Sequence, residues 1–239
     1  MIRTIRLSPR LLALAAALGA CPAPLLASGL QVEPVSVTMD QRSGIIWLTN
    51  SGDAPLEAQV RVHGWAQGPQ GDRLDPSEAL LASPPIVRIP AGGRQMVRLV
   101  SGAALACEDT FRLAIDELPD ARPSASGLRY VMHYSVPVFV TRRGCPDIAP
   151  QLSWQIATDP AGLRLVVENS GQMHAQLAQA AFIDARGRRT ELAPGLLGYV
   201  LAGARMTFTL PPPAEAAPQG GRIEILVNGK RTSQSLPAG

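Results

Sequence analysis

The segment LRYVMHYSVPVFV, residues 128–140, predicts the fold more clearly than any other part of the chain. Large apolar side chains occupy every second position in it, at Leu128, Tyr130, Met132, Tyr134, Val136 and Val138. Because side chains two residues apart share one face of a β-strand, this apolar stripe predicts a long strand. The opposite face is also partly apolar, with Val131 and Phe139. A strand that is apolar on both faces is either covered on both sides or open to a partner.

Pro137 predicts that one edge of this strand is unpaired within its own domain, because proline has no N–H to donate to a ladder. Exposed apolar edges promote aggregation, and proteins normally protect them. A retained open edge therefore indicates a strand that pairs with another polypeptide. The other interpretation is that the apolar stripe is the core of its own domain, and for part of its length we expect this to hold.

The rest of the chain is dominated by period-two apolar patterns separated by turn signals. Before residue 141 the pattern predicts about seven strands, as in an immunoglobulin-like sandwich. A polar break at residues 141–146 follows, and a second set of strands is predicted after it, at residues 152–157, 163–168, 175–184, 198–201, 206–210, 223–227 and 232–236. The predicted fold class is therefore all-β, with two β-sandwich domains at residues 28–143 and 144–239.

The first residues of the chain predict its compartment. A positive n-region comes first, with Arg3, Arg6 and Arg10. The apolar run over residues 11–20 is too short to span a bilayer, and small residues then lead to a cleavage site near Ala27. Residues 1–27 are therefore predicted to be a signal peptide for export. Residues 18–21, LGAC, have the form of a lipobox, so lipidation of Cys21 is the alternative. We expect no membrane span after the leader.

After the leader the chain keeps two cysteines, Cys107 and Cys145. In an oxidising compartment such a pair indicates a disulfide, and two free thiols are the alternative. Antiparallel partners have a constant sum of residue numbers, so this bridge centres a hairpin on residues 126–127. The same centre pairs residues 111–118 with the strand described above. The bridge would stabilise the domain by roughly 3–4 kcal/mol in the chain-entropy model.

Residues that catalyse reactions or hold metals are not grouped in the sequence. The three histidines, at positions 63, 133 and 174, have no metal-ligand spacing, and no GxSxG, P-loop or GxGxxG motif occurs. Asp116 and Glu117 are adjacent, so on a strand their carboxylates point to opposite faces. The formal net charge of +3 includes three leader arginines, so the mature chain is close to neutral and is not expected to bind nucleic acid. We expect no enzyme activity, no cofactor and no metal.

Several motifs, in this order and after a signal peptide, resemble periplasmic pilus chaperones of the chaperone–usher pathway. They are SPPIVRIPAG with QMVRL (residues 83–99), FRLAIDELP (111–119) and YSVPVF (134–139). The DELP and YSVPVF motifs are most similar to the archaic branch of that family, the spore coat U and Csu-like chaperones. The resemblance is strong over residues 30–140. It is looser in the second half, where VENSG (167–171) and GYVL (198–201) are the recognisable pieces.

The resemblance implies two immunoglobulin-like domains in a boomerang arrangement, and a donor strand that completes the unfinished sandwich of a pilus subunit. Carried to this sequence, the donor residues are Leu128, Tyr130, Met132, Tyr134 and Val136. The implied partners are a pilin-like subunit, an outer-membrane usher and, for the free chaperone, a second copy in a self-capped dimer. The alternatives are a pilus structural subunit and a secreted or lipid-anchored immunoglobulin-like binding module. A subunit would carry one incomplete domain, whereas both strand sets here look complete.

The sequence departs from the family at the site that holds the subunit's C-terminal carboxylate. The family has basic residues in the first and last strands of the first domain, and by our alignment this chain has Ser36 and Pro137 there. The candidates for a substitute anchor are Arg88, Arg112, Arg129 and His133. Glu117 and Arg98 are interpreted as members of a structural or interdomain ion pair.

Overall fold

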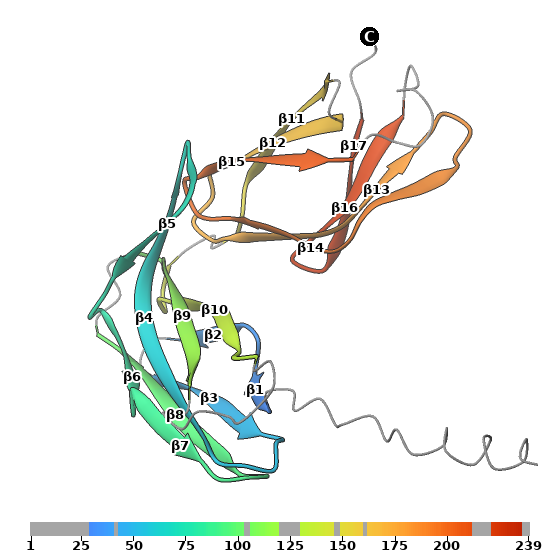
Figure 1. Ribbon diagram of the computed structural model, residues 1–239. Helices are drawn as coiled ribbons and strands as arrows, with labels where there is room; N and C mark the ends of the chain where they lie inside the picture. Colours follow the sequence, from blue (N-terminus) through green and yellow to red (C-terminus); the bar gives the residue numbers. More distant parts are fainter. Residues whose placement is uncertain are drawn as a thin grey trace, which may run out of the picture.

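The computed structural model describes residues 29–40, 43–102, 106–119, 130–145, 149–159, 162–211 and 221–235. All regular structure in these residues is β-strand, arranged in two lobes that meet at an angle (Figure 1). None of the described residues forms a helix with the length and hydropathy needed to cross a membrane. The predicted signal peptide and Cys21 lie outside the described residues. The all-β fold class with two sandwiches in a boomerang arrangement is confirmed.

The first lobe is a sandwich of two sheets. One sheet has the strand order β1 (Leu30–Glu33), β3 (Ser43–Asn50), β8 (Arg94–Ser101) and β6 (Leu80–Ser83). The other has the order β2 (Val37–Asp40), β10 (His133–Thr141), β9 (Glu108–Leu118), β4 (Leu56–Gly68) and β5 (Gly71–Pro76), with β7 (Ile86–Ile89) also paired with β4. Alternate apolar side chains of the two sheets, such as Leu99 on β8 and Leu113 on β9, fill the space between them.

The second lobe is a smaller sandwich. Its three-stranded sheet has the order β11 (Leu152–Asp159), β12 (Gly162–Asn169) and β15 (Arg205–Leu210). Its four-stranded sheet has the order β14 (Arg189–Val200), β13 (Ala175–Ile183), β16 (Arg222–Val227) and β17 (Lys230–Ser235). The apolar core of this lobe also contains Trp65 and Phe139 from the first lobe, so the two lobes share a packed boundary.

The chain changes sheets near its start, and this limits the pairing of β10. β1 pairs antiparallel with β3 in one sheet, and after residues 34–36 the chain continues as β2 in the other sheet. β2 runs parallel to β10, with the register Val138↔Val37 to Thr141↔Asp40. On the edge of β10 that faces away from β9, only the C-terminal part of the strand therefore has a partner strand among the described residues.

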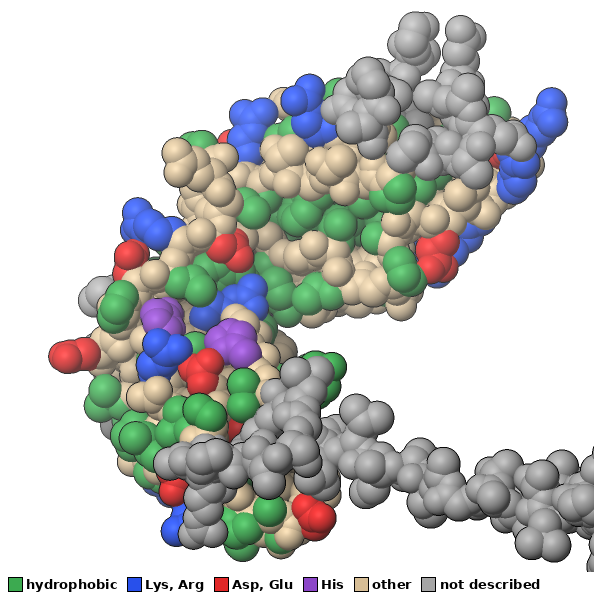
Figure 2. Space-filling view, in the orientation of Figure 1, with side chains coloured by type: hydrophobic (Ala, Val, Ile, Leu, Met, Phe, Trp, Pro, Cys, Tyr) green, Lys and Arg blue, Asp and Glu red, His purple; other side chains and the backbone are tan. Residues whose placement is uncertain are grey.

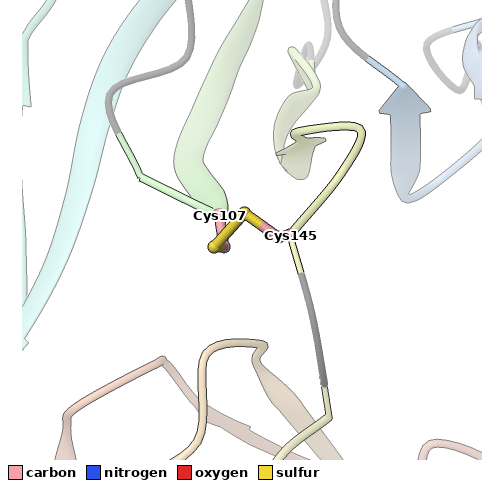
Figure 3. Close-up of a disulfide and its surroundings, with 2 residues drawn as sticks. All are labelled: Cys107 and Cys145. Atoms are coloured by element: carbon pink, nitrogen blue, oxygen red, sulfur yellow. A yellow bond between two sulfur atoms is a disulfide. The ribbon is translucent and has the colours of Figure 1, made fainter.

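The predicted disulfide is present, with the Cα atoms of Cys107 and Cys145 5.8 Å apart (Figure 3). The predicted strand register is wrong by three residues, because β10 pairs with β9 from His133↔Asp116 to Thr141↔Glu108. The physical reason is a turn after β10, in which Gly144 has a φ of +84°. This turn adds residues on one side of the hairpin before Cys145 returns to Cys107.

Two neighbouring residues of β8 test the sandwich core. Leu99 is 0% exposed and Val100 is 39% exposed, on opposite faces of the strand. We expect Leu99→Ala to lower the free energy of unfolding of the first domain by about 2–5 kcal/mol, because it leaves a cavity. Val100→Ala should cost less than about 1 kcal/mol. Urea denaturation measures both, and equal losses would contradict the assignment of faces.

Candidate functional site

One edge of β10 is open over its N-terminal half. β9 pairs with β10 from His133 to Thr141, whereas β2 reaches only as far as Val138. No strand among the described residues pairs with the second edge of residues 133–137. Pro137 is the last residue before the pairing with β2 begins. Among the described residues this edge, predicted from Pro137, is therefore not paired with a strand, and its one side-chain contact is a hydrogen bond from Arg112 Nη1 to Ser135 O at 3.5 Å.

Along the apolar stripe, the burial of the side chains decreases from the C-terminal part of β10 toward its N-terminal end and the residues before it. Val138 and Val136 are buried in the core of the first sandwich. Met132 and Tyr134 are partly buried against the same core, and Tyr130 is 55% exposed. One end of the stripe is therefore core of its own domain, as expected for part of its length, and the other end is exposed. Leu128 lies outside the described residues.

Tyr134 links this edge to the other sheet of the sandwich. Its hydroxyl donates a hydrogen bond to the backbone oxygen of Leu30 on β1, at 2.7 Å. The segment before β10 is held by Glu117 at the end of β9. The backbone N of Glu117 donates to the oxygen of Met132 at 2.9 Å, and the backbone N of Met132 donates to the Glu117 carboxylate at 3.3 Å. Glu117 is buried here, and Arg98 is exposed on β8 in the other sheet.

The opposite face of β10 carries Phe139 into the boundary with the second lobe. The Phe139 ring stacks on the imidazole of His174, with centroids 3.5 Å apart and an interplanar angle of 8°. Trp65 on β4 lies edge-on to Tyr199 on β14, with centroids 5.5 Å apart. Gln67 adds polar contacts, because its Oε1 accepts from Leu201 N at 2.8 Å and its Nε2 donates to Tyr199 O at 3.0 Å.

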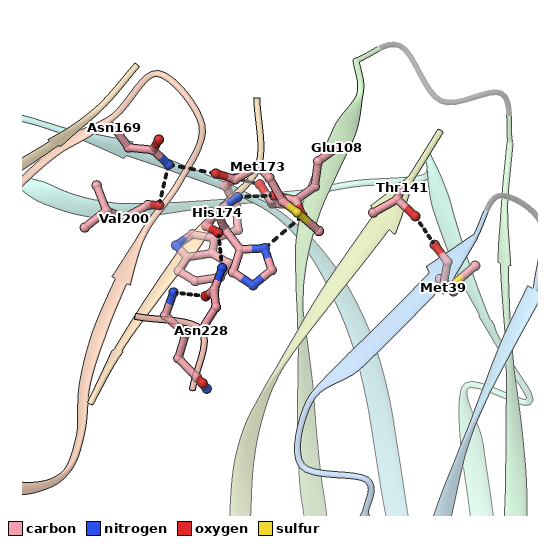
Figure 4. Close-up of polar contacts among 11 residues, drawn as sticks. Met39, Glu108, Thr141, Asn169, Met173, His174, Val200 and Asn228 are labelled. Atoms are coloured by element: carbon pink, nitrogen blue, oxygen red, sulfur yellow. Dashed lines mark hydrogen bonds and ion pairs between the residues drawn. The ribbon is translucent and has the colours of Figure 1, made fainter. Parts of the chain in front are cut away.

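Glu108, the first residue of β9, makes the interdomain carboxylate contact (Figure 4). Its carboxylate accepts two hydrogen bonds from His174, one from the backbone N at 2.7 Å and one from Nδ1 at 2.8 Å. Its side chain is 1% exposed. On the second lobe, Asn228 Nδ2 donates to His174 O, and Asn169 Nδ2 donates to Met173 O (Figure 4). The loop that carries His174 is therefore held from both sides.

The predicted anchor candidates lie in different places. His133 is bonded through Nδ1 to Asp116 at 2.6 Å, and Arg61 contacts the other oxygen of Asp116 at 2.8 Å. Burial raises the pKa of Asp116, but the hydrogen bonds from Arg61 and His133 outweigh this and leave the pKa below its usual value. Arg88 is exposed on β7, which pairs with β4. Arg129 lies outside the described residues.

Arg112 lies on β9, directly opposite Pro137 of β10 in the register. Its guanidinium is 3.8 Å from the centre of the Trp65 ring and 5.6 Å from that of Tyr199, and it forms no ion pair with a carboxylate among the described residues. Burial lowers the pKa of Arg112, with Asp72 and Tyr199 opposing the shift. Figure 2 shows basic and histidine side chains gathered on the first lobe beside the hollow between the lobes.

The interdomain roles of four residues were not predicted from the sequence: Trp65, Gln67, Glu108 and Tyr199. Tyr199 belongs to the GYVL motif, whose resemblance to the chaperone family could have indicated a role for this residue. Glu108 and Gln67 have no sequence pattern that distinguishes them from other polar surface residues. Within the part of the chain that the structure describes, no group of three or more His, Cys, Asp or Glu side chains is placed to hold a metal ion.

Residues 29–145 match the family model for the PapD N-terminal domain, described as a pili and flagellar-assembly chaperone. The matched range contains β1 to β10, the open edge and both cysteines of the disulfide. No curated protein matches the sequence.

Solved structures similar to this chain are pilus chaperones, some of them in complex with subunits. One is a chain of the CsuC–CsuE chaperone–tip adhesion subunit complex from archaic chaperone–usher Csu pili of Acinetobacter baumannii, with 23% identity, a TM-score of 0.64, and 86% of this chain and 97% of that chain covered. Another is from the Salmonella enterica SafA pilin in complex with the SafB chaperone, with 16% identity, a TM-score of 0.63, and 90% and 99% covered. The Pseudomonas aeruginosa CupB2 chaperone has 18% identity, a TM-score of 0.56, and 86% and 98% covered. The shared fold is that of two immunoglobulin-like domains.

Proposed function

We propose that this protein is a periplasmic chaperone that folds and caps pilus subunits by donor-strand complementation. Two observations support this proposal. The edge of β10 at residues 133–137 has no partner strand among the described residues, and the apolar stripe of the same segment runs from the buried Val138 to the exposed Tyr130, just before β10. A subunit that lacks one strand of its sandwich would pair with this edge. In the proposal, residues 28–143 form the donor domain, residues 144–239 form the second domain and residues 1–27 are the export signal.

Physical chemistry supports a binding mode that needs no nucleotide. Main-chain hydrogen bonds along an added strand give affinity that depends little on the partner's sequence. Burial of one large side chain, such as Tyr130, contributes on the order of 2 kcal/mol. Met132 and Tyr134 are already partly buried, so they would contribute less. The energy that drives capture is the unfinished core of the subunit.

Several features support the finer parts of the proposal. The DELP and YSVPVF motifs and the fold shared with the CsuC–CsuE complex support the archaic branch. The predicted signal peptide, residues 1–27, supports a periplasmic location. A free chaperone with an open β10 edge would also be able to cap itself by pairing with a second copy, since an unpaired edge is a template for another strand.

We further propose Arg112 as the anchor for the subunit's C-terminal carboxylate. The family's basic position in the last strand is Pro137 here, and Arg112 is its direct cross-strand neighbour, so the positive charge is displaced by one strand. A guanidinium without a carboxylate partner among the described residues is suited to a bidentate carboxylate bond. His133 is a weaker candidate, because its Nδ1 is already hydrogen-bonded to the Asp116 carboxylate.

The outer-membrane usher is the proposed second partner, and an exposed apolar face supports a docking surface for it. Leu81 on β6 and Val100 on β8 are direct cross-strand neighbours, Ile45 on β3 lies diagonally from Val100, and all three are exposed. Arg94 and Arg98 are exposed on the same strand face. Apolar patches with a polar rim are typical of protein interaction sites. This sheet does not contain β10, so a subunit and an usher would not compete for it.

Charges in the apolar stripe test the donor strand. We expect Tyr130→Asp with Met132→Asp to abolish co-purification of a co-expressed pilin-type subunit, because a carboxylate cannot be buried without a partner. Tyr130→Asp alone should weaken capture without a change in stability, since this side chain is largely exposed. Leu196→Asp, at an exposed position on β14, is the matched control and should capture normally. Normal capture by the double variant would reject the donor-strand assignment.

The anchor is tested with Arg112→Ala and, as control, Arg88→Ala. A charged hydrogen bond contributes about 1.5–3 kcal/mol, so Arg112→Ala should weaken subunit binding by roughly tenfold or more. Arg88→Ala should bind as the wild type does. A subunit with an amidated C-terminus separates anchoring from folding effects, because it should bind the wild type and Arg112→Ala equally. If Arg112→Ala weakens both subunits alike, the anchor lies elsewhere.

The usher surface is tested with Leu81→Glu combined with Val100→Glu. Because both side chains are exposed, we expect this variant to fold and to capture a subunit normally. Its complex should not bind the immobilised periplasmic domain of the usher in a pull-down. Unchanged usher binding would place the docking surface on another face.

A further inference from the structure

The disulfide and the interdomain carboxylate occupy adjacent positions at the start of β9. Cys107 is bonded to Cys145, and the next residue, Glu108, accepts both hydrogen bonds from His174 in the second lobe. Cys145 follows the end of β10 and precedes β11, so it lies on the chain that connects the two lobes (Figure 3). One point of the first lobe therefore holds both a covalent link to the connecting chain and a polar link to the second lobe.

The polar link is specific because the groups are removed from water. A buried carboxylate is stable only while its hydrogen-bond donors are in place. Among the described residues, both donors to the Glu108 carboxylate belong to His174, whose ring is also stacked on Phe139 of β10. We call Glu108, His174 and Phe139 the clasp. Glu108 pairs with Thr141 in the β9–β10 register, so the clasp draws on both strands close to the disulfide.

The disulfide shortens the free path between the lobes. After Thr141 the chain turns, Arg142 N donates to Cys107 O at 2.9 Å, and Cys145 is fixed beside Cys107. On the second lobe the connection is held at Gln151, whose backbone N donates to Asn169 Oδ1 and whose O accepts from Ser170 N. On the first lobe, the disulfide moves the last fixed point of the connection from Arg142 to Cys145, three residues closer to Gln151. A shorter connection restricts the orientations that two domains can sample.

We infer that the Cys107–Cys145 disulfide is an interdomain brace: it fixes the angle between the two lobes by holding Glu108 and the connecting chain at one point. Reduction by a dithiol such as dithiothreitol leaves two protein thiols and a cyclic disulfide of the reagent. The reduced chain keeps its first sandwich, because β9 and β10 remain paired from His133 to Thr141, but its clasp loosens.

The test compares the oxidised protein with Cys107→Ser/Cys145→Ser. The ring protons of His174 report the clasp by NMR, because the stacked Phe139 ring shifts them upfield. We expect the variant to lose this upfield shift and to show a larger radius of gyration in X-ray scattering, while the far-ultraviolet dichroism of the strands stays unchanged. The same two changes are expected when dithiothreitol is added to the folded wild-type protein, which covers the case of a variant that fails to fold.

Two further variants separate a brace from a disulfide that only stabilises the first domain. Leu99→Ala weakens the first sandwich away from the clasp and should change neither the His174 shift nor the scattering. Glu108→Gln keeps the disulfide, loses the carboxylate and should loosen the clasp. Combining Glu108→Gln with the double serine variant should change the His174 shift and the radius of gyration little more than either change alone, because both act on the same contact. Unchanged scattering and an unchanged His174 shift in the reduced protein, with only a lower melting temperature, would overturn the inference.

Discussion

The incomplete pairing of β10 is the constraint on which the rest of the structure depends. β9 satisfies one edge of the strand along its whole length, whereas β2 satisfies the other edge only from Val138 onward. This limit follows from the change of sheets between β1 and β2, because residues that pair with β3 are not available to β10. Backbone groups must find partners, in solvent or in another chain. The open edge is therefore a direct result of how the N-terminal strands are divided between the sheets.

The fold also limits the hazard that an open apolar edge creates. Pro137 removes one backbone donor where the pairing with β2 ends, and the outward side chains of His133 and Ser135 are polar and exposed. Tyr134 is tied to β1 by its hydroxyl, so part of the apolar stripe is covered by its own domain. Only the end of the stripe near Tyr130 is largely exposed among the described residues. The edge can thus be kept open with little apolar surface in contact with water.

Local patterns in the sequence predicted the features that depend on local spacing. Alternation predicted β10 and its buried stripe, and the two cysteines predicted the disulfide. The register failed because a sum of residue numbers assumes a regular hairpin, and the turn at Gly144 adds residues on one side. The pattern before residue 141 predicted about seven strands, whereas the described residues form ten there; β5, for example, has no apolar alternation in its GDRLDP sequence and is largely exposed. Glu108 and His174, 66 residues apart, could not be paired from the sequence, since nothing local distinguishes either side chain.

β10 contributes to three surfaces: the core of the first sandwich, the boundary with the second lobe and the open edge. All three depend on the register in which β10 pairs with β9. Val136 and Val138 face the core of the first sandwich, Phe139 faces the second lobe, and the edge at residues 133–137 faces outward. A slip of one residue would exchange the two faces of the strand, because side chains alternate with period two. Phe139 would then enter the first core, and a valine would replace it against His174. A covalent bond just beyond Thr141, at the end away from the open edge, opposes such a slip without occupying the backbone groups that the open edge presents.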